Sequence, residues 1–129
     1  MSATKILKLM KEKEVDYVDL RFTDPRGKLQ HLTMDGKIVD EEMLNKGVYF
    51  DGSSIAGWKA INESDMILKP DLERQVVDPF TSHNTLILFC DVLDAVKKDP
   101  YERDPRSTAK KAEAYLKKSG IGDKANFGP

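Results

Sequence analysis

Residues 86–92 read Leu-Ile-Leu-Phe-Cys-Asp-Val, a run in which only Asp91 is charged. A short run that is apolar almost without interruption is typical of a strand buried on both faces. Turn residues at 82–84 precede it, so we expect the strand to begin at Thr85 and to lie in the middle of a sheet. Cys90, the only cysteine, is then a small buried apolar residue, and a disulfide within one chain is excluded.

The amino-terminal residues predict a short helix followed by a strand. Ser2 or Thr4 can cap an amphipathic helix to about residue 13, because the apolar residues recur there at helical spacing. From residue 15 the period changes to two, and Val18, Leu20 and Phe22 fall on one side of a half-buried strand. The opposite side carries Tyr17, Asp19 and Arg21.

Two reversals follow this strand. Residues 24–27, Asp-Pro-Arg-Gly, have the composition of a type I turn, which leads into a second strand with Leu32 and Met34 on one face. Residues 35–36, Asp-Gly, then predict a second tight reversal into a short third piece at 38–39. The expected result is a hairpin with a short extension.

The next segments predict a brief helix and two strand pieces. Asp40 can cap a helix through residues 41–44 that Gly47 ends. Residues 66–68 form a strand that Pro70 is expected to end, and residues 76–77 form a separate apolar piece before the turn residues at 78–79.

The carboxyl-terminal residues predict a longer helix after a charged, proline-containing boundary at 97–104. Asp104 is the expected cap, Pro105 lies in the first turn, and Gly120 ends the helix. The expected buried stripe consists of Ala109, Ala112, Tyr115 and Leu116. The lysines of this helix form either a solvated face, which we favour, or an anion site.

Composition describes an ordinary globular chain of 129 residues, with 40% hydrophobic and 33% charged residues. The 21 basic and 22 acidic side chains nearly cancel, which argues against a general nucleic-acid or anionic-membrane surface. No signal peptide and no apolar run of membrane-spanning length are visible, so we expect a cytoplasmic protein that does not bind membranes.

The loop at 48–58, Val-Tyr-Phe-Asp-Gly-Ser-Ser-Ile-Ala-Gly-Trp, carries the candidate functional residues. Asp51 ends an apolar run, Ser53 offers a hydroxyl, and Trp58 suits an interface or a ligand wall. The run after Asp51 lacks the Gly-Lys-Ser/Thr ending of a P-loop, and Asp-Gly-Ser-Ser is also a common turn. Asp65 can form a carboxylate pair with Asp51.

The two histidines, His31 and His83, have no acid or cysteine at familiar metal-ligand spacing and are expected to be structural or exposed. Residues alone therefore indicate an α+β domain with one acidic loop.

Five segments closely resemble the amino-terminal region of bacterial type I glutamine synthetase, in the same order. They are residues 50–58, residues 62–66 (Asn-Glu-Ser-Asp-Met), residues 78–80 (Asp-Pro-Phe), residues 104–107 (Asp-Pro-Arg-Ser) and residues 127–129 (Phe-Gly-Pro). The likeness runs essentially from end to end of the chain. It implies a small β-grasp-like mixed sheet with short helices over residues 1–103, and a linker and first helix of a truncated catalytic domain over residues 104–129.

The resemblance also implies an activity. Family members join ammonia to glutamate with ATP, through a γ-glutamyl phosphate, and need Mg²⁺ or Mn²⁺. Their subunits form a dodecamer of two six-membered rings, in which the amino-terminal domain of one subunit completes the neighbour's active site.

By position, Asp51 is similar to the loop aspartate that binds ammonium and removes its proton. Ser53 is similar to a serine beside it, Trp58 to a wall near the nucleotide, and Asp65 to an acid near the intersubunit site. No metal ligand is expected in this chain, because the ligands for metal and ATP follow Phe-Gly-Pro in the family.

The chain stops at Pro129, so the resemblance predicts that these 129 residues alone are inactive. An alternative remains open, in which the chain is a stand-alone β-grasp domain used for binding. A Glu-x-Glu strand encoded after Pro129 would favour the first interpretation, and a natural stop codon would favour the second.

Overall fold

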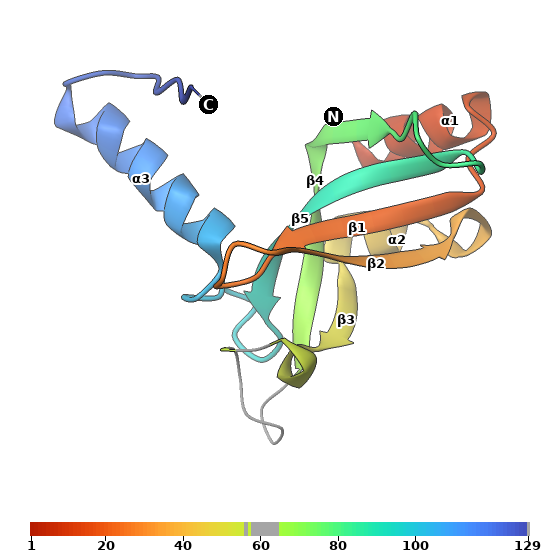
Figure 1. Ribbon diagram of the computed structural model, residues 1–129, viewed down its shortest axis with the longest axis horizontal. Helices are drawn as coiled ribbons and strands as arrows, with labels where there is room; N and C mark the ends of the chain where they lie inside the picture. Colours follow the sequence, from red (N-terminus) through yellow and green to blue (C-terminus); the bar gives the residue numbers. More distant parts are fainter. Residues whose placement is uncertain (56, 58–64, 129) are drawn as a thin grey trace.

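The computed structural model describes residues 1–55, 57 and 65–128. In this part of the chain a five-stranded mixed sheet, in the order β2-β1-β5-β4-β3, is combined with three α-helices (Figure 1). The strands are β1 (Tyr17–Thr23), β2 (Leu29–Asp35), β3 (Val48–Asp51), β4 (Asp65–Val77) and β5 (Thr85–Asp94). The helices are α1 (Ala3–Glu12), α2 (Glu41–Lys46) and α3 (Pro105–Ser119). The predicted α+β class is confirmed.

Strand β5 occupies the centre of the sheet, as its apolar run predicts. It pairs in parallel with β1 and antiparallel with β4. Leu86, Leu88 and Val92 are fully buried, together with Cys90, on the face that α1 and α2 cover. Burial of each leucine contributes about 1.5–3 kcal/mol, so β5 and its neighbours account for most of the core.

The helix ends follow the predicted caps. Ser2 accepts a hydrogen bond from the Lys5 amide at the start of α1, and Asp40 accepts one from the Met43 amide at the start of α2. Gly47 ends α2 with a φ of 90°, and Gly120 ends α3 in the left-handed conformation. Capping side chains and terminal glycines therefore predicted most of the helix boundaries.

The sequence predicted that strand β4 would end at Pro70. The strand instead continues to Val77 and includes the apolar pair at 76–77. Pro70 lies opposite Cys90, and the register with β5 shifts between Pro70 and Gln75. A proline is tolerated where a bulge already interrupts the ladder, because no partner there needs its missing N–H. The strand turns a corner rather than stopping (Figure 1).

The hairpin is confirmed, whereas its expected extension is not a strand. Gly27 donates to the Asp24 carbonyl at 3.0 Å and closes the turn between β1 and β2. Residues 36–38 form a 3-10 turn instead of a third strand piece, capped by Asp35 at the Lys37 amide. Gly36 permits this turn, because a Cβ there would lie 2.8 Å from the Val15 carbonyl oxygen.

Helix α3 does not bury the predicted stripe. Tyr115 is 71% exposed, Ala109 and Ala112 are exposed, and Leu116 is only half-buried. The reason is tertiary, since α3 contacts the sheet at its first turn and then extends away from it (Figure 1). Periodicity identified the apolar face of the helix but not whether anything in the described chain covers it.

Candidate functional site

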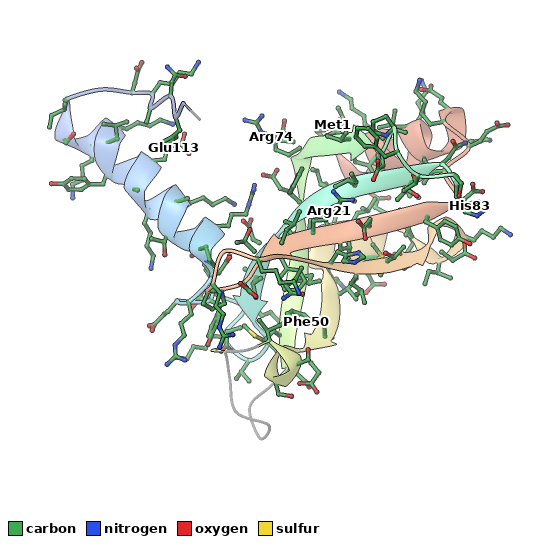
Figure 2. The ribbon with its side chains drawn as sticks, in the orientation of Figure 1. Met1, Arg21, Phe50, Arg74, His83 and Glu113 are labelled. Atoms are coloured by element: carbon green, nitrogen blue, oxygen red, sulfur yellow. The ribbon has the colours of Figure 1, made fainter. Side chains whose placement is uncertain are left out.

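Strand β3 carries the acidic loop at the edge of the sheet. Gly47 brings the chain close to β4, where a Cβ would lie 2.5 Å from the Leu68 carbonyl oxygen. Phe50 packs against Phe22 on the core side, with ring centroids 5.3 Å apart, and Figure 2 shows Phe50 at the end of the strand. Side chains alternate along a strand, so Asp51 points to the opposite face of the sheet and is exposed.

Asp51 organises a tight turn from its own side chain. Its Oδ1 accepts a hydrogen bond from the Ser53 amide at 2.9 Å, and its carbonyl accepts one from the Ser54 hydroxyl at 2.8 Å. The Ile55 amide closes the 3-10 turn of residues 52–54 on the Gly52 carbonyl at 3.1 Å. The turn interpretation of Asp-Gly-Ser-Ser is thus confirmed, and the turn fixes the orientation of the carboxylate.

A second carboxylate lies directly opposite the first. Asp51 pairs with Asp65 in the antiparallel register of β3 and β4, and both residues are exposed. Directly opposite residues have Cβ atoms about 4.5–5.5 Å apart and share a face of the sheet. Two like charges at this spacing repel each other and favour a cation between or beside them.

The structure describes the other candidate site residues only in part. Ser53 is half-buried beside Asp51, and its described contact to Asp51 is through the backbone amide. Trp58 and the segment at 62–64 lie outside the described residues. Ile55 and Gly52 are buried and anchor the described part of the turn to the domain.

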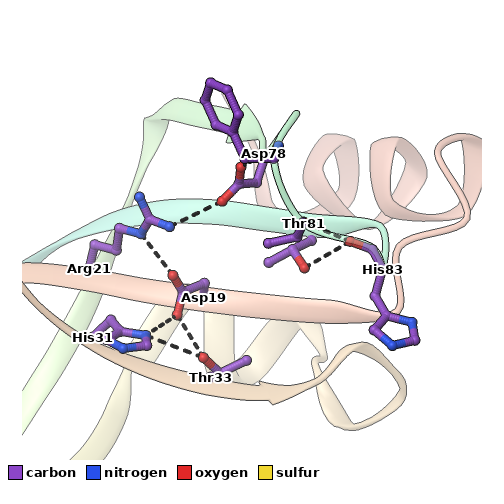
Figure 3. Close-up of polar contacts among 9 residues, drawn as sticks. Asp19, Arg21, His31, Thr33, Asp78, Thr81 and His83 are labelled. Carbon is purple, nitrogen blue, oxygen red and sulfur yellow. Dashed lines mark hydrogen bonds and ion pairs between the residues drawn. The ribbon is translucent and has the colours of Figure 1, made fainter.

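Sequence reasoning missed a polar network on the same outer face of the sheet (Figure 3). Asp19 is only 4% exposed; its Oδ1 accepts from His31 Nδ1 and Thr33 Oγ1, both at 2.8 Å, and its Oδ2 from Arg21 Nε at 2.7 Å. Arg21 also reaches Asp78 at 3.3 Å. The cross-strand pairs Asp19–Thr33 and Arg21–His31, fixed by the turn at 24–27, were the signal that could have revealed the network.

The environment of Asp19 sets its protonation. Burial alone raises the pKa of this carboxyl, but hydrogen bonds from Arg21, His31 and Thr33 together outweigh burial, and the pKa lies below its usual value. The two histidine side chains remain exposed, at 63% for His31 and 65% for His83, as the sequence predicted.

A third polar cluster fixes the first turn of α3. Asp104 is 1% exposed and accepts hydrogen bonds from the Arg106 amide at 3.1 Å and the Val92 amide at 3.2 Å. Burial raises the pKa of Asp104 in spite of these bonds. Arg106 in turn donates to Asp91 at 2.7 Å and to Asp71. The helix is thereby joined to both β4 and β5.

An open cleft of about 1190 Å³ separates the outer part of α3 from the bend of β4. Phe89, Val76 and Leu116 supply apolar surface, and Figure 2 shows Arg74 and Glu113 on its two sides. Two of the four α3 lysines form ion pairs, Lys110 with Asp91 and Lys117 with Glu113. This pairing favours a solvated, ion-paired face over an anion site.

The described residues lack the side-chain clusters of a protein metal centre. They contain no group of three or more His, Cys, Asp or Glu side chains arranged to hold a metal ion. Asp51 and Asp65 offer two exposed carboxylates, which suit a small cation better than a triphosphate. No helix in the described part of the chain is long and apolar enough to span a bilayer.

The family model and the relatives that match this chain carry the same family name. The family model described as "Glutamine synthetase, beta-Grasp domain" matches residues 14–95. A glutamine synthetase of Rhizobium meliloti strain 1021 is 62% identical over 128 residues, which cover 99% of this chain and 27% of the relative. A glutamine synthetase of Escherichia coli strain K12 is 53% identical over 129 residues, which cover the whole chain and 28% of the relative.

Solved structures agree in fold. A Plasmodium falciparum glutamine synthetase superposes with a TM-score of 0.83 at 23% identity, covering 93% of this chain and 23% of that one. The apo form of GmaS gives a TM-score of 0.80 at 21% identity, covering 90% and 27% of the two chains. The chain thus spans about a quarter of the length of the relatives it matches.

Proposed function

Because the chain belongs to the glutamine synthetase family and matches its β-grasp domain, we propose that it is the amino-terminal part of an ATP-dependent glutamate–ammonia ligase. In this reaction ATP phosphorylates the side-chain carboxylate of glutamate to γ-glutamyl phosphate. Ammonia then attacks the acyl carbon, and phosphate leaves. The residues of this chain act on the ammonia half of the reaction.

Asp51 binds ammonium and accepts its proton. A carboxylate attracts a small cation, and ammonium has no lone pair for attack until a base removes one proton. The single observation that carries the proposal is the position of Asp51, exposed at the end of β3 with its orientation fixed by the Ser53 amide. Asp65, directly opposite, adds a second negative charge that favours the cation.

The rest of the active site is assigned to other parts of the assembly. The ligands of ATP and of Mg²⁺ or Mn²⁺ lie mainly outside the described residues, and Trp58 forms a wall beside the nucleotide. In this proposal Asp51 acts in the site of a neighbouring subunit, within a dodecamer of two six-membered rings in the cytoplasm. The family membership supports this arrangement.

A domain boundary near residue 103 accompanies this assignment. Residues 1–103 form the β-grasp domain, and residues 104–129 begin the catalytic domain. Two observations support the boundary: α3 contacts the sheet mainly through its first turn, and its apolar face is exposed.

The test is an Asp51→Asn variant in a full-length subunit that carries this chain. Asparagine keeps the turn-forming oxygen but cannot take up a proton, so the turn persists while the base is lost. We expect kcat/KM for ammonium to fall by about 10²-fold or more, which is the usual contribution of general acid–base catalysis. Steady-state glutamine formation at varied ammonium concentration measures it.

Asp35→Asn is the matched control. Asp35 is also exposed, ends a strand, caps a 3-10 turn and accepts from the amide two residues ahead, at 2.8 Å. It has no assigned role in the reaction, so this variant should keep the parent kinetics. Equal effects of the two substitutions would refute the assignment of Asp51.

A further inference from the structure

Arg103 extends from a fixed point of the backbone. The Tyr101 amide donates to the Val92 carbonyl at 2.9 Å, and the Asp104 amide donates to the Tyr101 carbonyl at 3.1 Å. Asp104 itself is buried and bonded to the Val92 amide. Tyr101 and Asp104, two residues before and one residue after Arg103, are therefore bonded to Val92 of β5, the central strand.

The Arg103 side chain holds the backbone at Gly57, three residues beyond the 3-10 turn of residues 52–54. Its Nη1 donates to the Gly57 carbonyl at 2.9 Å, although 46 residues separate the two. Gly57 has a φ of 89°, and a Cβ there would lie 3.8 Å from the Pro25 ring. Gly57 is thus placed between the β1–β2 turn and the connection from β5 to α3.

The orientation of Asp51 depends on the turn between these anchors. Its carboxylate is fixed by the Ser53 amide, and the turn at Ser53 is closed by the Ile55 amide on the Gly52 carbonyl. Strand pairing with β4 holds the start of the turn, and burial of Ile55 holds its middle. Arg103 supplies a separate hydrogen bond two residues beyond Ile55.

We propose that Arg103 is a positioning residue for the ammonium site, since its guanidinium holds the Gly57 carbonyl and thereby fixes the turn that carries Asp51. The inference rests on the proposed function and adds to it a residue remote in sequence from the loop. Arginine suits this role because its rigid, planar group loses less conformational entropy per hydrogen bond than lysine does.

The experiment compares Arg103→Ala and Arg103→Lys with the parent in a full-length subunit that carries this chain. One solvent-exposed hydrogen bond from a charged donor contributes only a modest free energy, so we expect Arg103→Ala to raise KM for ammonium by about threefold to tenfold. Arg103→Lys should recover part of the loss, because lysine keeps a charged donor.

A second readout follows the turn itself. Hydrogen–deuterium exchange of the Ser53 and Ile55 amides should accelerate in Arg103→Ala and not in Glu102→Ala. Glu102 is the preceding exposed residue and serves as the control. Unchanged exchange, or faster exchange with an unchanged KM for ammonium, would overturn the inference.

Asp51→Asn separates the two possible failures. If it impairs ammonium use while Arg103→Ala does not, only the role of Arg103 is wrong. If Asp51→Asn has no effect on ammonium use, the proposed function fails, and the positioning role fails with it.

Discussion

Asp19 joins β1 and β2 through a buried carboxylate that three neighbours satisfy. Arg21, His31 and Thr33 donate to its two oxygens at 2.7–2.8 Å. A buried charge is tolerated only when its hydrogen-bonding capacity is filled. Burial raises the pKa of Asp19, but the hydrogen bonds outweigh this effect, so the pKa is lowered overall. The network therefore stabilises the fold only while Asp19 is ionised.

The pH dependence of stability follows from the sign of this shift. The pKa of Asp19 is lower in the folded chain than the ordinary value of 3.8, so the unfolded chain binds more protons as the pH falls below about 4. Its stabilisation is present above that pH and is lost progressively below it. The pKa of Asp24 is also lowered, through a hydrogen bond from Gln30, so Asp19 accounts for part of the acid sensitivity.

We expect Asp19→Asn to destabilise the chain by about 1–3 kcal/mol at pH 7, because a hydrogen-bonded charge next to Arg21 is lost. Its free energy of unfolding should also fall less steeply than that of the parent between pH 5 and pH 2. Urea unfolding followed by circular dichroism at several pH values measures both. Parallel pH curves for the two proteins would contradict the assigned role of Asp19.

Residue patterns predicted those parts of the site that depend on neighbours in sequence. Asp51, its turn and its exposure followed from an acid placed between an apolar run and small polar residues. Asp19 was assigned to a polar side by alternation, but its burial depends on His31 and Thr33 in the next strand and on Arg21 folding back. Alternation gives the face of a strand, whereas burial on that face depends on tertiary contacts.

At the scale of the elements, the helix caps and the central strand were predictable, and two extents were not. Ser2, Asp40 and Asp104 cap their helices through bonds that span only two or three residues. Pro70 did not end β4, because the bulge that accommodates it depends on β5. The α3 stripe stayed exposed for a similar reason, since burial needs a partner that periodicity does not reveal.

Asp104 is the residue through which α3 is joined to the sheet. Asp104→Ala removes the cap of α3 and leaves the buried Val92 amide without its acceptor, so we expect a loss of about 2–4 kcal/mol. Asp104→Asn keeps one of the two acceptor oxygens, so it should lose less than the alanine variant at pH 7. Urea unfolding of both variants at pH 7 makes the comparison.

The asparagine variant also tests the charge. Burial raises the pKa of Asp104, so its ionisation opposes folding as the pH rises from 3.8 through the folded pKa. Asp104→Asn has no such term, and its stability relative to the parent should improve over that range. If the alanine and asparagine variants lose equal stability at pH 7, the negative charge rather than the acceptor holds the helix.

At the scale of the whole molecule, the turn at Asp51 forms within this chain, whereas the proposed catalytic activity needs a longer chain. The bonds described for the turn come from within the chain, from the Ser53 amide and the Ser54 hydroxyl to Asp51, and Arg103 binds the Gly57 carbonyl beyond it. The glutamine synthetases that resemble this chain are about four times as long. A loop aspartate can orient a substrate, but phosphoryl transfer needs bound metal ions, and the described residues contain no group of three or more His, Cys, Asp or Glu side chains arranged to hold one.

We therefore expect the isolated 129-residue polypeptide to form no glutamine above a blank, even with ATP, Mg²⁺, glutamate and ammonium at saturation. Joined to the remaining three quarters of the Rhizobium meliloti relative, in place of the corresponding residues, the same chain should support glutamine formation, because 62% identity leaves the packing at the junction largely intact. Circular dichroism must first establish that the isolated polypeptide is folded. Asp51→Asn in the chimera should then abolish most of the activity, while Asp35→Asn should not. Turnover by the isolated polypeptide would place the whole reaction within this chain, and an inactive but correctly assembled chimera would favour a stand-alone binding domain instead.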